Sequence, residues 1–272
     1  PLADSTISNR LTYMLRCPQQ KTRQGLALPC LLYNGRMSER PIPFAPGEYF
    51  HCFTRGVDKR KIFMEENDCE RFQALLYTCN STEPIHISNL NHPARQGLAL
   101  PYVMTRERGE QLVDIAAYCL MPNHLHLLLR EIDYGGISSF MQKVGTGYTM
   151  FFNKKYERTG ALFSGKFKAV HVGSDAHSRR VINYIHANAA ELYEPGWKKG
   201  MVRNVKKLKN QLLAYPYSSL IDYEGKERPQ ARILAKDAAR ELADAVPSFK
   251  ALLDDARAFY NYEKNTLTEL EG

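Results

Sequence analysis

Polar and apolar side chains alternate most clearly at residues 124–129, where the chain reads His-Leu-His-Leu-Leu-Leu. Successive side chains of a β-strand point to opposite faces of the sheet, so residues two apart share a face. A strand here places His124 and His126 on one face. Leu125, Leu127 and Leu129 then point from the other face toward a core. Two imidazoles side by side on a strand supply half of a divalent-metal site. The same pattern also describes two histidines that are packed or hydrogen-bonded on a half-buried sheet.

Four further stretches have the composition of strands. Residues 47–55 follow a Pro-Gly turn and are rich in aromatic side chains, which favours a strand. Residues 111–121 form a second candidate, which leads through a Pro-Asn kink into the histidine strand. Residues 85–87 and 102–105 are short candidates.

Apolar residues at helical spacing predict helices between and after these strands. In chain order we expect helices at about 67–79, 137–156, 177–193, 235–245 and 249–262. Candidate N-caps for four of them are Asn67 or Asp68, Ser138 or Ser139, Ser174 or Asp175, and Ser248. Strands interspersed with helices predict an α+β sandwich with a C-terminal helical extension.

Composition is that of a globular protein and excludes several classes. Of the 272 residues, 44% are hydrophobic and 24% charged, and no run approaches the roughly 18 apolar residues of a membrane span. Residues 1–20 show no apolar stretch typical of a secretory signal. The six cysteines are scattered and form no C-x-x-C pair. This spacing argues against a zinc ribbon or a disulfide scaffold and favours a reducing compartment.

The positive charge is concentrated in one part of the chain. The net charge is +8, and residues 138–210 hold fourteen Lys or Arg against four Asp or Glu, whereas residues 226–272 hold eight against nine. A basic excess just after the histidine strand favours a polyanionic partner, most simply nucleic acid. A solvated basic surface is the alternative.

Candidate DNA contacts lie where basic and aromatic residues alternate. They are Arg55, Lys59 and Arg60 after the first strand, and Arg158, Lys166 and Lys168 around Phe163 and Phe167. Cations follow the phosphate backbone and aromatic rings stack on bases in proteins that bind single strands. Core packing explains the two phenylalanines equally well.

The helix expected at 177–193 carries the remaining candidate chemistry. Tyr184 and Asn188 are four residues apart, so they project from one face of that helix. If this face covers the histidine strand, Asn188 can be a third metal ligand beside His124 and His126. The phenol of Tyr184 would then lie next to the metal, where it could attack a phosphodiester. An ordinary core tyrosine fits the same pattern.

Five stretches together resemble a known family. They are residues 47–56, Met-Pro-Asn-His-Leu-His at 121–126, the basic aromatic stretch at 156–168, Tyr-Ile-His-Ala-Asn at 184–188, and Tyr-Pro-Tyr-Ser-Ser at 215–219. In this combination and order they resemble the single-tyrosine transposases of the HUH endonuclease class, most closely the REP-associated tyrosine transposases. The likeness extends over roughly residues 42–223.

The resemblance implies a ferredoxin-like (RRM-like) palm with a central antiparallel sheet. It implies that His124, His126 and Asn188 bind Mg²⁺ or Mn²⁺. Tyr184 would cut single-stranded DNA and keep a 5′-phosphotyrosine link. The family often continues after the asparagine with proline and a basic residue, whereas this chain has Ala189-Ala190-Glu191. We therefore expect the helix to run on and one phosphate contact to be weakened. Tyr148 is the fallback nucleophile, although the other residues on its face of the helix are mostly apolar.

These observations predict three segments. Residues 1–46 are irregular, residues 47–223 form the transposase domain, and residues 224–272 form the helical tail. The heptapeptide at 23–29 recurs unchanged at 95–101, and since two copies are too few for a solenoid, we interpret both as loop insertions, the second near 88–101.

The predicted function is a metal-dependent endonuclease and strand transferase that acts on single-stranded, hairpin-forming repeat DNA. The resemblance implies a bacterial, cytoplasmic protein that associates with the nucleoid when bound to DNA. Two alternatives stay open: a DNA-hairpin-binding protein that has lost catalysis, and a metal-dependent phosphohydrolase that acts on a small molecule. The oligomeric state is left open.

Overall fold

The computed structural model describes residues 43–83, 100–235, 237–238 and 248–264. Within it, Phe44–Gly272 form one compact unit. The expectations for residues 1–42, for a strand at 85–87, for the repeats at 23–29 and 95–99 and for most of a helix at 235–245 lie outside the described residues. No helix in the described part of the chain is both long enough and apolar enough to cross a membrane.

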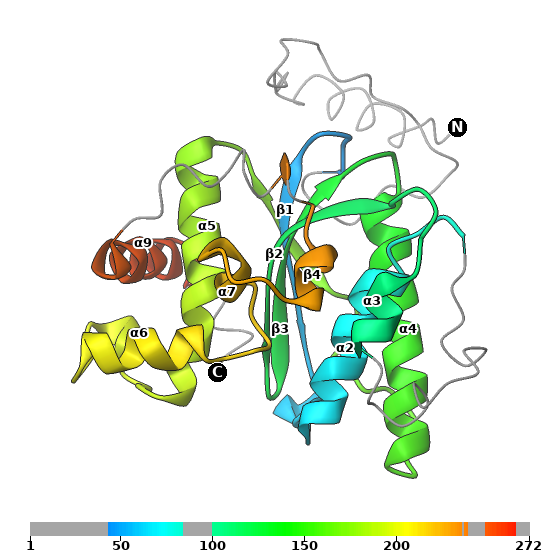
Figure 1. Cartoon of the computed structure of the whole chain (residues 1–272), viewed down its shortest axis with the longest axis horizontal. Coiled ribbons are helices and arrows are strands. Elements are labelled where there is room, and N and C mark those ends of the chain that lie inside the picture. The colour runs from blue at the N-terminus through cyan, green and yellow to red at the C-terminus, as the bar shows by residue number, and fades with distance from the viewer. Residues whose placement is uncertain (1–42, 84–99, 236, 239–247, 265–272) are drawn as a thin grey trace, which may run out of the picture. The chain divides into compact units, whose positions relative to one another are not determined.

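A four-stranded antiparallel sheet forms the centre of this unit (Figure 1). Its strands are β1 (Tyr49–Arg55), β2 (Val113–Met121), β3 (His124–Glu131) and β4 (Lys168–Val172), in the spatial order β2-β3-β1-β4. With α2 (Glu66–Thr78) and α4 (Gly136–Lys155), the order along the chain is β-α-β-β-α-β. The first three strands are where the sequence predicts them. Strand β4 was not expected, because residues 154–168 were interpreted as a basic loop that continues to Lys168.

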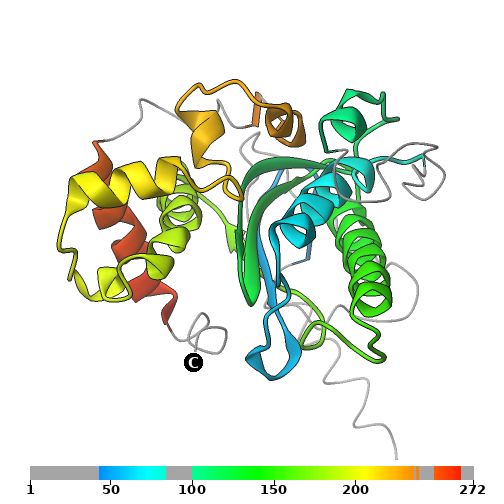
Figure 2. The same cartoon turned by 60° about the horizontal axis from the view of Figure 1, so that its bottom comes forward.

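The two faces of the sheet have separate cores, because side chains alternate along each strand. Figures 1 and 2 show α2 and α4 on one side of the sheet and α5 (Asp175–Ala187) and α9 (Phe249–Tyr262) on the other. Leu125, Leu127 and Leu129 pack toward α2 and α4 with the rest of that core. The predicted alternation of the histidine strand is therefore confirmed.

Acidic side chains cap α2 and α4, and of the predicted residues only Asp68 takes part, from the first turn of α2. Helix α2 begins one residue before the expected cap, with Glu65 as N-cap and Asp68 completing a capping box. At α4 the carboxylate of Glu131 accepts hydrogen bonds from the backbone N–H groups of Gly135 and Ile137, both at 2.7 Å. Ser138 and Ser139 are therefore not caps, because Glu131, at the end of β3, already satisfies these N–H groups.

Helix α5 ends earlier than the sequence predicts. Ser174 is its N-cap, as predicted, and its hydroxyl accepts from the N–H of His177 at 3.2 Å. The α-helix stops at Ala187 and continues as a 3₁₀ helix, η4 (Asn188–Leu192). The chain without the family's proline thus does not extend the α-helix to residue 193. Instead it tightens into a 3₁₀ turn, as helix ends often do.

Residues 100–105 were expected to include a short strand but form α3 (Leu100–Thr105). A short apolar run does not distinguish a strand from a helix by periodicity. The remaining helices include α6 (Val205–Leu213), which the sequence showed only as a Lys/Arg cluster, and α7 (Leu220–Tyr223). Short 3₁₀ helices lie at Val57–Lys59, Trp197–Lys199 and Pro229–Ile233.

Helix α9 agrees with the prediction for residues 249–262, and Ser248 caps it by accepting from the N–H of Ala251 at 3.3 Å. It packs along α5, where Asn183 donates to the carboxylate of Asp255 at 3.0 Å. The helical extension therefore adds to the core on the α5 face of the sheet.

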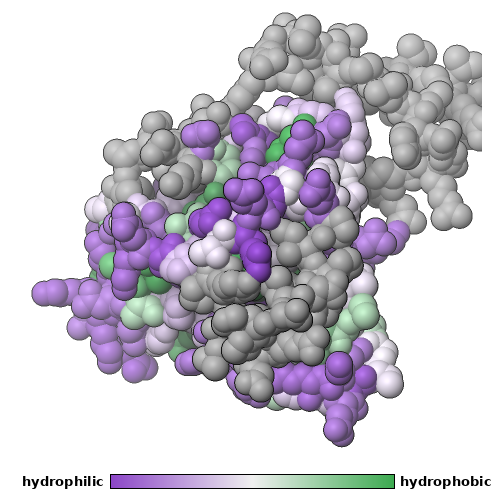
Figure 3. All heavy atoms as spheres, turned by 45° about the vertical axis from the view of Figure 1, so that its right-hand side comes forward, coloured by the Kyte–Doolittle hydropathy of each residue, from purple (hydrophilic) through white to green (hydrophobic). Residues whose placement is uncertain are grey.

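On the face drawn in Figure 3, hydrophilic residues cover most of the described surface and apolar residues form only small separate patches.

Candidate active site

The two histidines of β3 face α5, on the side of the sheet opposite the leucines. His124 pairs with Arg55 and Met121, and His126 pairs with Phe53 and Cys119. This register fixes both rings on one face because residues two apart in a strand point the same way. His126 is fully buried and His124 exposes 7% of its surface.

The side-chain amide of Asn188 lies between the two imidazoles. Its Oδ1 is 3.1 Å from Nε2 of His124, and its Nδ2 is 3.2 Å from Nε2 of His126. The Nε2 atoms of both histidines therefore converge on one buried amide at the junction of α5 and η4. The structure thus brings together the three residues that the sequence predicts as metal ligands.

Tyr184 lies one turn before Asn188 on the same face of α5. Its ring centroid is 5.4 Å from that of His126, with the ring planes at 83°. The expectation that Tyr184 and Asn188 share a face directed at the histidine strand agrees with this geometry. Tyr148, the fallback nucleophile, belongs to the core on the opposite face, where its hydroxyl donates to the carbonyl oxygen of Ile62.

A third histidine completes the cluster. His51 of β1 is fully buried, and its Nε2 is 3.0 Å from Nδ1 of His126. His51 lies within the matching stretch 47–56, and no role was predicted for it. Strand alternation could have placed His51 and Phe53 on one face of β1, but which core that face meets is known only from the structure.

Burial disfavours the charged form of His126 and of His51. Loss of hydration lowers the pKa of His126 well below its usual range, and the neighbouring charges of His124, His51 and Lys198 lower it further. Burial likewise lowers the pKa of His51 to about 3, with a smaller contribution from His177. Neutral imidazoles have a free lone pair, which is the state that binds a metal ion.

Helix α9 covers Tyr184 in this structure. The ring of Phe259 is 5.0 Å from that of Tyr184 and 5.6 Å from that of His51, and Tyr260 stacks against Tyr184 at 6.4 Å. Tyr184 exposes none of its surface. The sequence predicted the helix but not its contact with the tyrosine, because the two segments are about 75 residues apart.

The basic loops predicted as DNA contacts lie together at the His124 end of the sheet. Loop 56–60 is hydrogen-bonded to the 162–164 stretch through Val57 N to Leu162 O at 2.9 Å and Ser164 N to Arg55 O at 2.8 Å. Gly56 N also donates to the carbonyl oxygen of Asn123 at 2.9 Å. This loop pair therefore begins directly beside His124.

The individual cations of these loops differ in their surroundings. Lys59, Lys166 and Lys168 are exposed, whereas Arg60 pairs with Asp58 at 3.8 Å. Arg158 donates to the Oδ1 of Asn153 at 2.7 Å near the end of α4. Phe163 and Phe167 are partly buried against the core on the α2 and α4 face, so core packing accounts for much of their surface.

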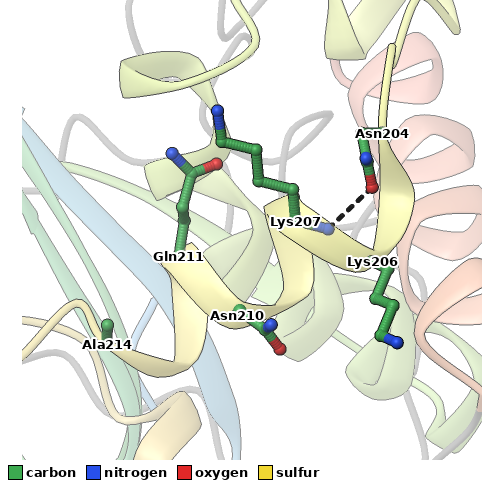
Figure 4. A pocket seen from close by; sticks show the side chains of 6 residues that line it. All are labelled: Asn204, Lys206, Lys207, Asn210, Gln211 and Ala214. Carbon is green, nitrogen blue, oxygen red and sulfur yellow. Dashed lines mark hydrogen bonds between the residues drawn. The ribbon is translucent and has the colours of Figure 1, made fainter.

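A second polar surface lies on α6. A shallow hollow of about 430 Å³ follows this helix (Figure 4), and its lining residues are Asn204, Lys206, Lys207, Asn210, Gln211 and Ala214. Asn204 caps the helix by accepting from the N–H of Lys207 at 2.9 Å. Leu208 and Leu212 turn inward to the core that also holds Ala189 and Ala190 of η4. The hollow includes none of the histidines, but its helix packs beside the segment that begins at Asn188.

The family model described as "Transposase IS200 like" matches residues 100–188, which hold β2, β3, α4, β4 and α5 with the two β3 histidines, Tyr184 and Asn188. No curated protein matches the chain. A solved structure described as a REP-associated tyrosine transposase bound to a REP hairpin aligns with 77% of this chain and 95% of that chain, at 13% identity and a TM-score of 0.43. The family match covers about a third of the chain and includes the predicted ligands and nucleophile. Residues 100–188 are therefore similar to the IS200-like transposase domain.

Proposed function

We propose that the protein is a metal-dependent transposase that nicks and rejoins single-stranded, hairpin-associated DNA through Tyr184. The observation that carries the proposal is the convergence of His124, His126 and Asn188 on one buried point, with the ring of Tyr184 5.4 Å from that of His126. The β-α-β-β-α-β order supports the ferredoxin-like palm that the resemblance implies.

The donor set fits a divalent cation. Two imidazole nitrogens and one amide oxygen are neutral ligands that suit first-row metals, and a partly filled set leaves positions for phosphate oxygens. Among the described residues no group of three His, Cys, Asp or Glu side chains is arranged to hold a metal. We assign the amide oxygen of Asn188 as the third ligand because this amide lies at the Nε2 atoms of both histidines. When bound, Mg²⁺ or Mn²⁺ would polarise the scissile phosphate and offset the charge on its oxygens.

The proposed reaction exchanges one phosphodiester for another. The phenolic oxygen of Tyr184 attacks phosphorus, the P–O3′ bond breaks, and the phenol hydrogen is transferred overall to the departing 3′ oxygen. The 5′ phosphate stays on Tyr184, and attack by another 3′-hydroxyl reverses the step and joins a new strand. Because a diester is replaced by a diester, the same residues serve both cleavage and joining.

The basic loops supply the path for the strand. Lys59 and Lys166 are exposed on the loop pair that adjoins His124, and Lys168 is exposed at the start of β4. There they would contact phosphates on either side of the scissile bond. Such contacts position the backbone without reading the sequence. Tyr184 is buried under α9, so the reaction also requires that helix to separate from α5.

The test is an adduct assay with the full chain. Labelled single-stranded hairpin DNA from the flanks of its gene is mixed with the protein and Mn²⁺ or Mg²⁺, beside the variants Tyr184→Phe and Tyr148→Phe. We expect label on the denatured wild-type protein and on Tyr148→Phe, but none on Tyr184→Phe or without metal. Label that persists on Tyr184→Phe would contradict the proposed nucleophile.

A second candidate function is binding of DNA hairpins without cleavage. Two observations favour it: Tyr184 exposes none of its surface, and Ala189 and Ala190 stand where the family often has proline and a basic residue. This function predicts tight hairpin binding by wild type and by Tyr184→Phe, with no adduct from either protein at any metal concentration.

A further inference from the structure

His51 occupies a position where a polar residue needs an explanation. It lies in the middle of β1, where the residues two before and two after it on the same face are Tyr49 and Phe53, both buried in the α5-side core. Its Nδ1 has no hydrogen-bond partner among the described residues. Burying a polar group without a hydrogen-bond partner is destabilising, so an apolar residue would serve packing better.

Among the residues that the structure describes, the one polar contact that His51 makes is with His126. Its Nε2 lies 3.0 Å from Nδ1 of His126, and the two ring planes are within 19° of parallel. On the opposite side of the His126 ring, the amide nitrogen of Asn188 lies 3.2 Å from Nε2. An amide nitrogen can only donate, so Nε2 of His126 accepts there and the hydrogen of the neutral ring is on Nδ1.

We propose that His51 is a positioning residue for His126: its Nε2 accepts the Nδ1 hydrogen of His126 and so keeps Nε2 of His126 free to bind the metal. Metal-bound histidines usually donate their other ring N–H to a fixed acceptor, which sets both the tautomer and the ring orientation. The inference rests on the proposed function, because it assigns His51 a role toward the metal of that site.

This role accounts for the cost of burying His51. When His51 accepts at Nε2, its own hydrogen is on Nδ1, the atom without a partner. The unfavourable burial of that N–H is retained because an aliphatic side chain at this place could not accept from His126. The acceptor comes from β1, next to β3 in the sheet, so the tautomer of His126 is fixed by the pairing of the two strands.

Three variants of the full chain separate hydrogen bonding from packing. His51→Leu removes the acceptor and fills the space. His51→Gln keeps an acceptor, since its Oε1 is as many bonds from Cβ as Nε2 of histidine. Phe53→Leu is the matched control, because Phe53 lies on the same strand and face, is fully buried, and has its ring 6.0 Å from that of His126.

The first readout is Mn²⁺ affinity, measured by the electron paramagnetic resonance of free Mn²⁺ during titration without DNA. We expect His51→Leu to bind about 10–100-fold more weakly than wild type, and both His51→Gln and Phe53→Leu to stay close to wild type. Equal affinities of His51→Leu and Phe53→Leu would overturn the inference.

The second readout does not depend on any variant folding. In ¹⁵N-labelled wild type loaded with Mg²⁺, we expect the His126 hydrogen on Nδ1 and a coupling across the hydrogen bond to Nε2 of His51. A hydrogen found on Nε2 of His51 would overturn the proposal. The variants His124→Ala and His126→Ala distinguish failure of the proposed metal site from failure of the role of His51. If neither variant weakens Mn²⁺ binding, the proposed metal site is wrong. If both weaken it while His51→Leu does not, only the role of His51 is wrong.

Discussion

Asn188 connects the helix that carries Tyr184 to the strand that carries the histidines. Its amide is the hydrogen-bond partner of Nε2 in both His124 and His126. The amide oxygen accepts from the Nε2–H of His124, whereas the amide N–H donates to the lone pair of Nε2 in His126. A bound cation would take the place of that hydrogen and use that lone pair, so the amide would hold the two imidazoles in place until a metal replaces its hydrogen bonds. The same side chain would thus both stabilise the folded protein and offer an oxygen to the proposed metal.

We therefore expect Asn188→Leu to bind Mn²⁺ more weakly and also to be less stable, by about 1–3 kcal/mol for the unpaired nitrogens. Asn188→Asp keeps an oxygen and adds a negative charge, so it should bind Mn²⁺ at least as tightly as wild type. Mn²⁺ titration and urea unfolding measure the two effects. The matched control is Asn183→Leu on the same helix, which removes only the hydrogen bond to Asp255; if it weakens Mn²⁺ binding equally, Asn188 is not a specific ligand.

Tyr148, in contrast to Asn188, is expected to affect stability alone. Its buried hydroxyl donates to the carbonyl oxygen of Ile62, and burial strongly raises the pKa of its phenol. Tyr148→Phe should lower the free energy of unfolding by about 1–3 kcal/mol, because the carbonyl is left without its partner, while adduct formation stays at the wild-type level. Chemical denaturation and the adduct assay check both parts, and a loss of adduct at unchanged stability would contradict the structural role of Tyr148.

Four residues of the candidate site could be predicted from the sequence. The two-residue spacing of His124 and His126 and the four-residue spacing of Tyr184 and Asn188 are local periodicities, so each pair could be placed on one face. The contact of His51 with His126 could not be predicted, because it depends on the register between strands 75 residues apart. The covering of Tyr184 by Phe259 has the same long-range origin.

At the scale of elements, α4 shows how two glycines in one helix differ. A methyl group added at Gly145 would meet nothing within 4 Å, whereas one added at Gly147 would lie 3.3 Å from Cδ2 of Leu75 on α2. Gly145 therefore lowers helix propensity with no compensating contact. Gly147 allows the close approach of α2 and α4, whose facing residues form the core on that side of the sheet.

Gly145→Ala should accordingly raise the free energy of unfolding by about 1 kcal/mol, the usual difference in helix propensity between alanine and glycine. Gly147→Ala should gain less or lose stability, because Leu75 has to shift. Urea unfolding of the two variants under identical conditions gives the comparison. An equal gain from both would mean that the contact with Leu75 is not tight.

In the proposed reaction, helix α9 has to move away from α5 before Tyr184 can attack DNA. Cysteines placed at Asn183 and Asp255, whose side chains touch across α5 and α9, allow the helices to be joined by a short bismaleimide. The cross-linked protein should form no adduct, while the same protein before cross-linking should form it. The single variants Asn183→Cys and Asp255→Cys, treated with the same reagent, control for reaction at the native cysteines. Undiminished adduct from the cross-linked protein would show that Tyr184 is reached without this movement.

Helices and strands could be predicted where the hydrophobic pattern extends over many residues, and not where the element is short. The strands β1 to β3 and helices α4 and α9 follow sustained patterns. Strand β4 has five residues and lies directly after a basic loop, and α3 has six, so neither has enough residues for its period to be visible. The caps Glu65 and Glu131 were missed because serine, asparagine and aspartate are the commoner capping residues.

The whole molecule combines the proposed metal site with basic surfaces around it. The loop pair next to His124 carries exposed lysines, and α6, beside η4, carries Lys206 and Lys207 exposed on its outer side. A single strand held at the histidines and a hairpin stem lying along a second basic surface would use both. The excess of positive charge in residues 138–210, visible in the sequence, is thus divided over separate surfaces that only the fold reveals.

The salt dependence of hairpin binding measures the contribution of α6. Removing one lysine that neutralises a phosphate should reduce the slope of log K against log salt by about 0.7–0.9, so Lys206→Ala and Lys207→Ala together should reduce it by about 1.4–1.8, with unchanged Mn²⁺ affinity. Lys226→Ala is the matched control, because Lys226 is exposed between Glu224 and Glu227 and should leave the slope unaltered. Equal slopes for wild type and the double variant would exclude α6 from the interface and leave the loops beside His124 as the proposed DNA contacts. The salt slope tests the basic surface and the Mn²⁺ affinity tests the metal site, so either proposal can be contradicted without the other.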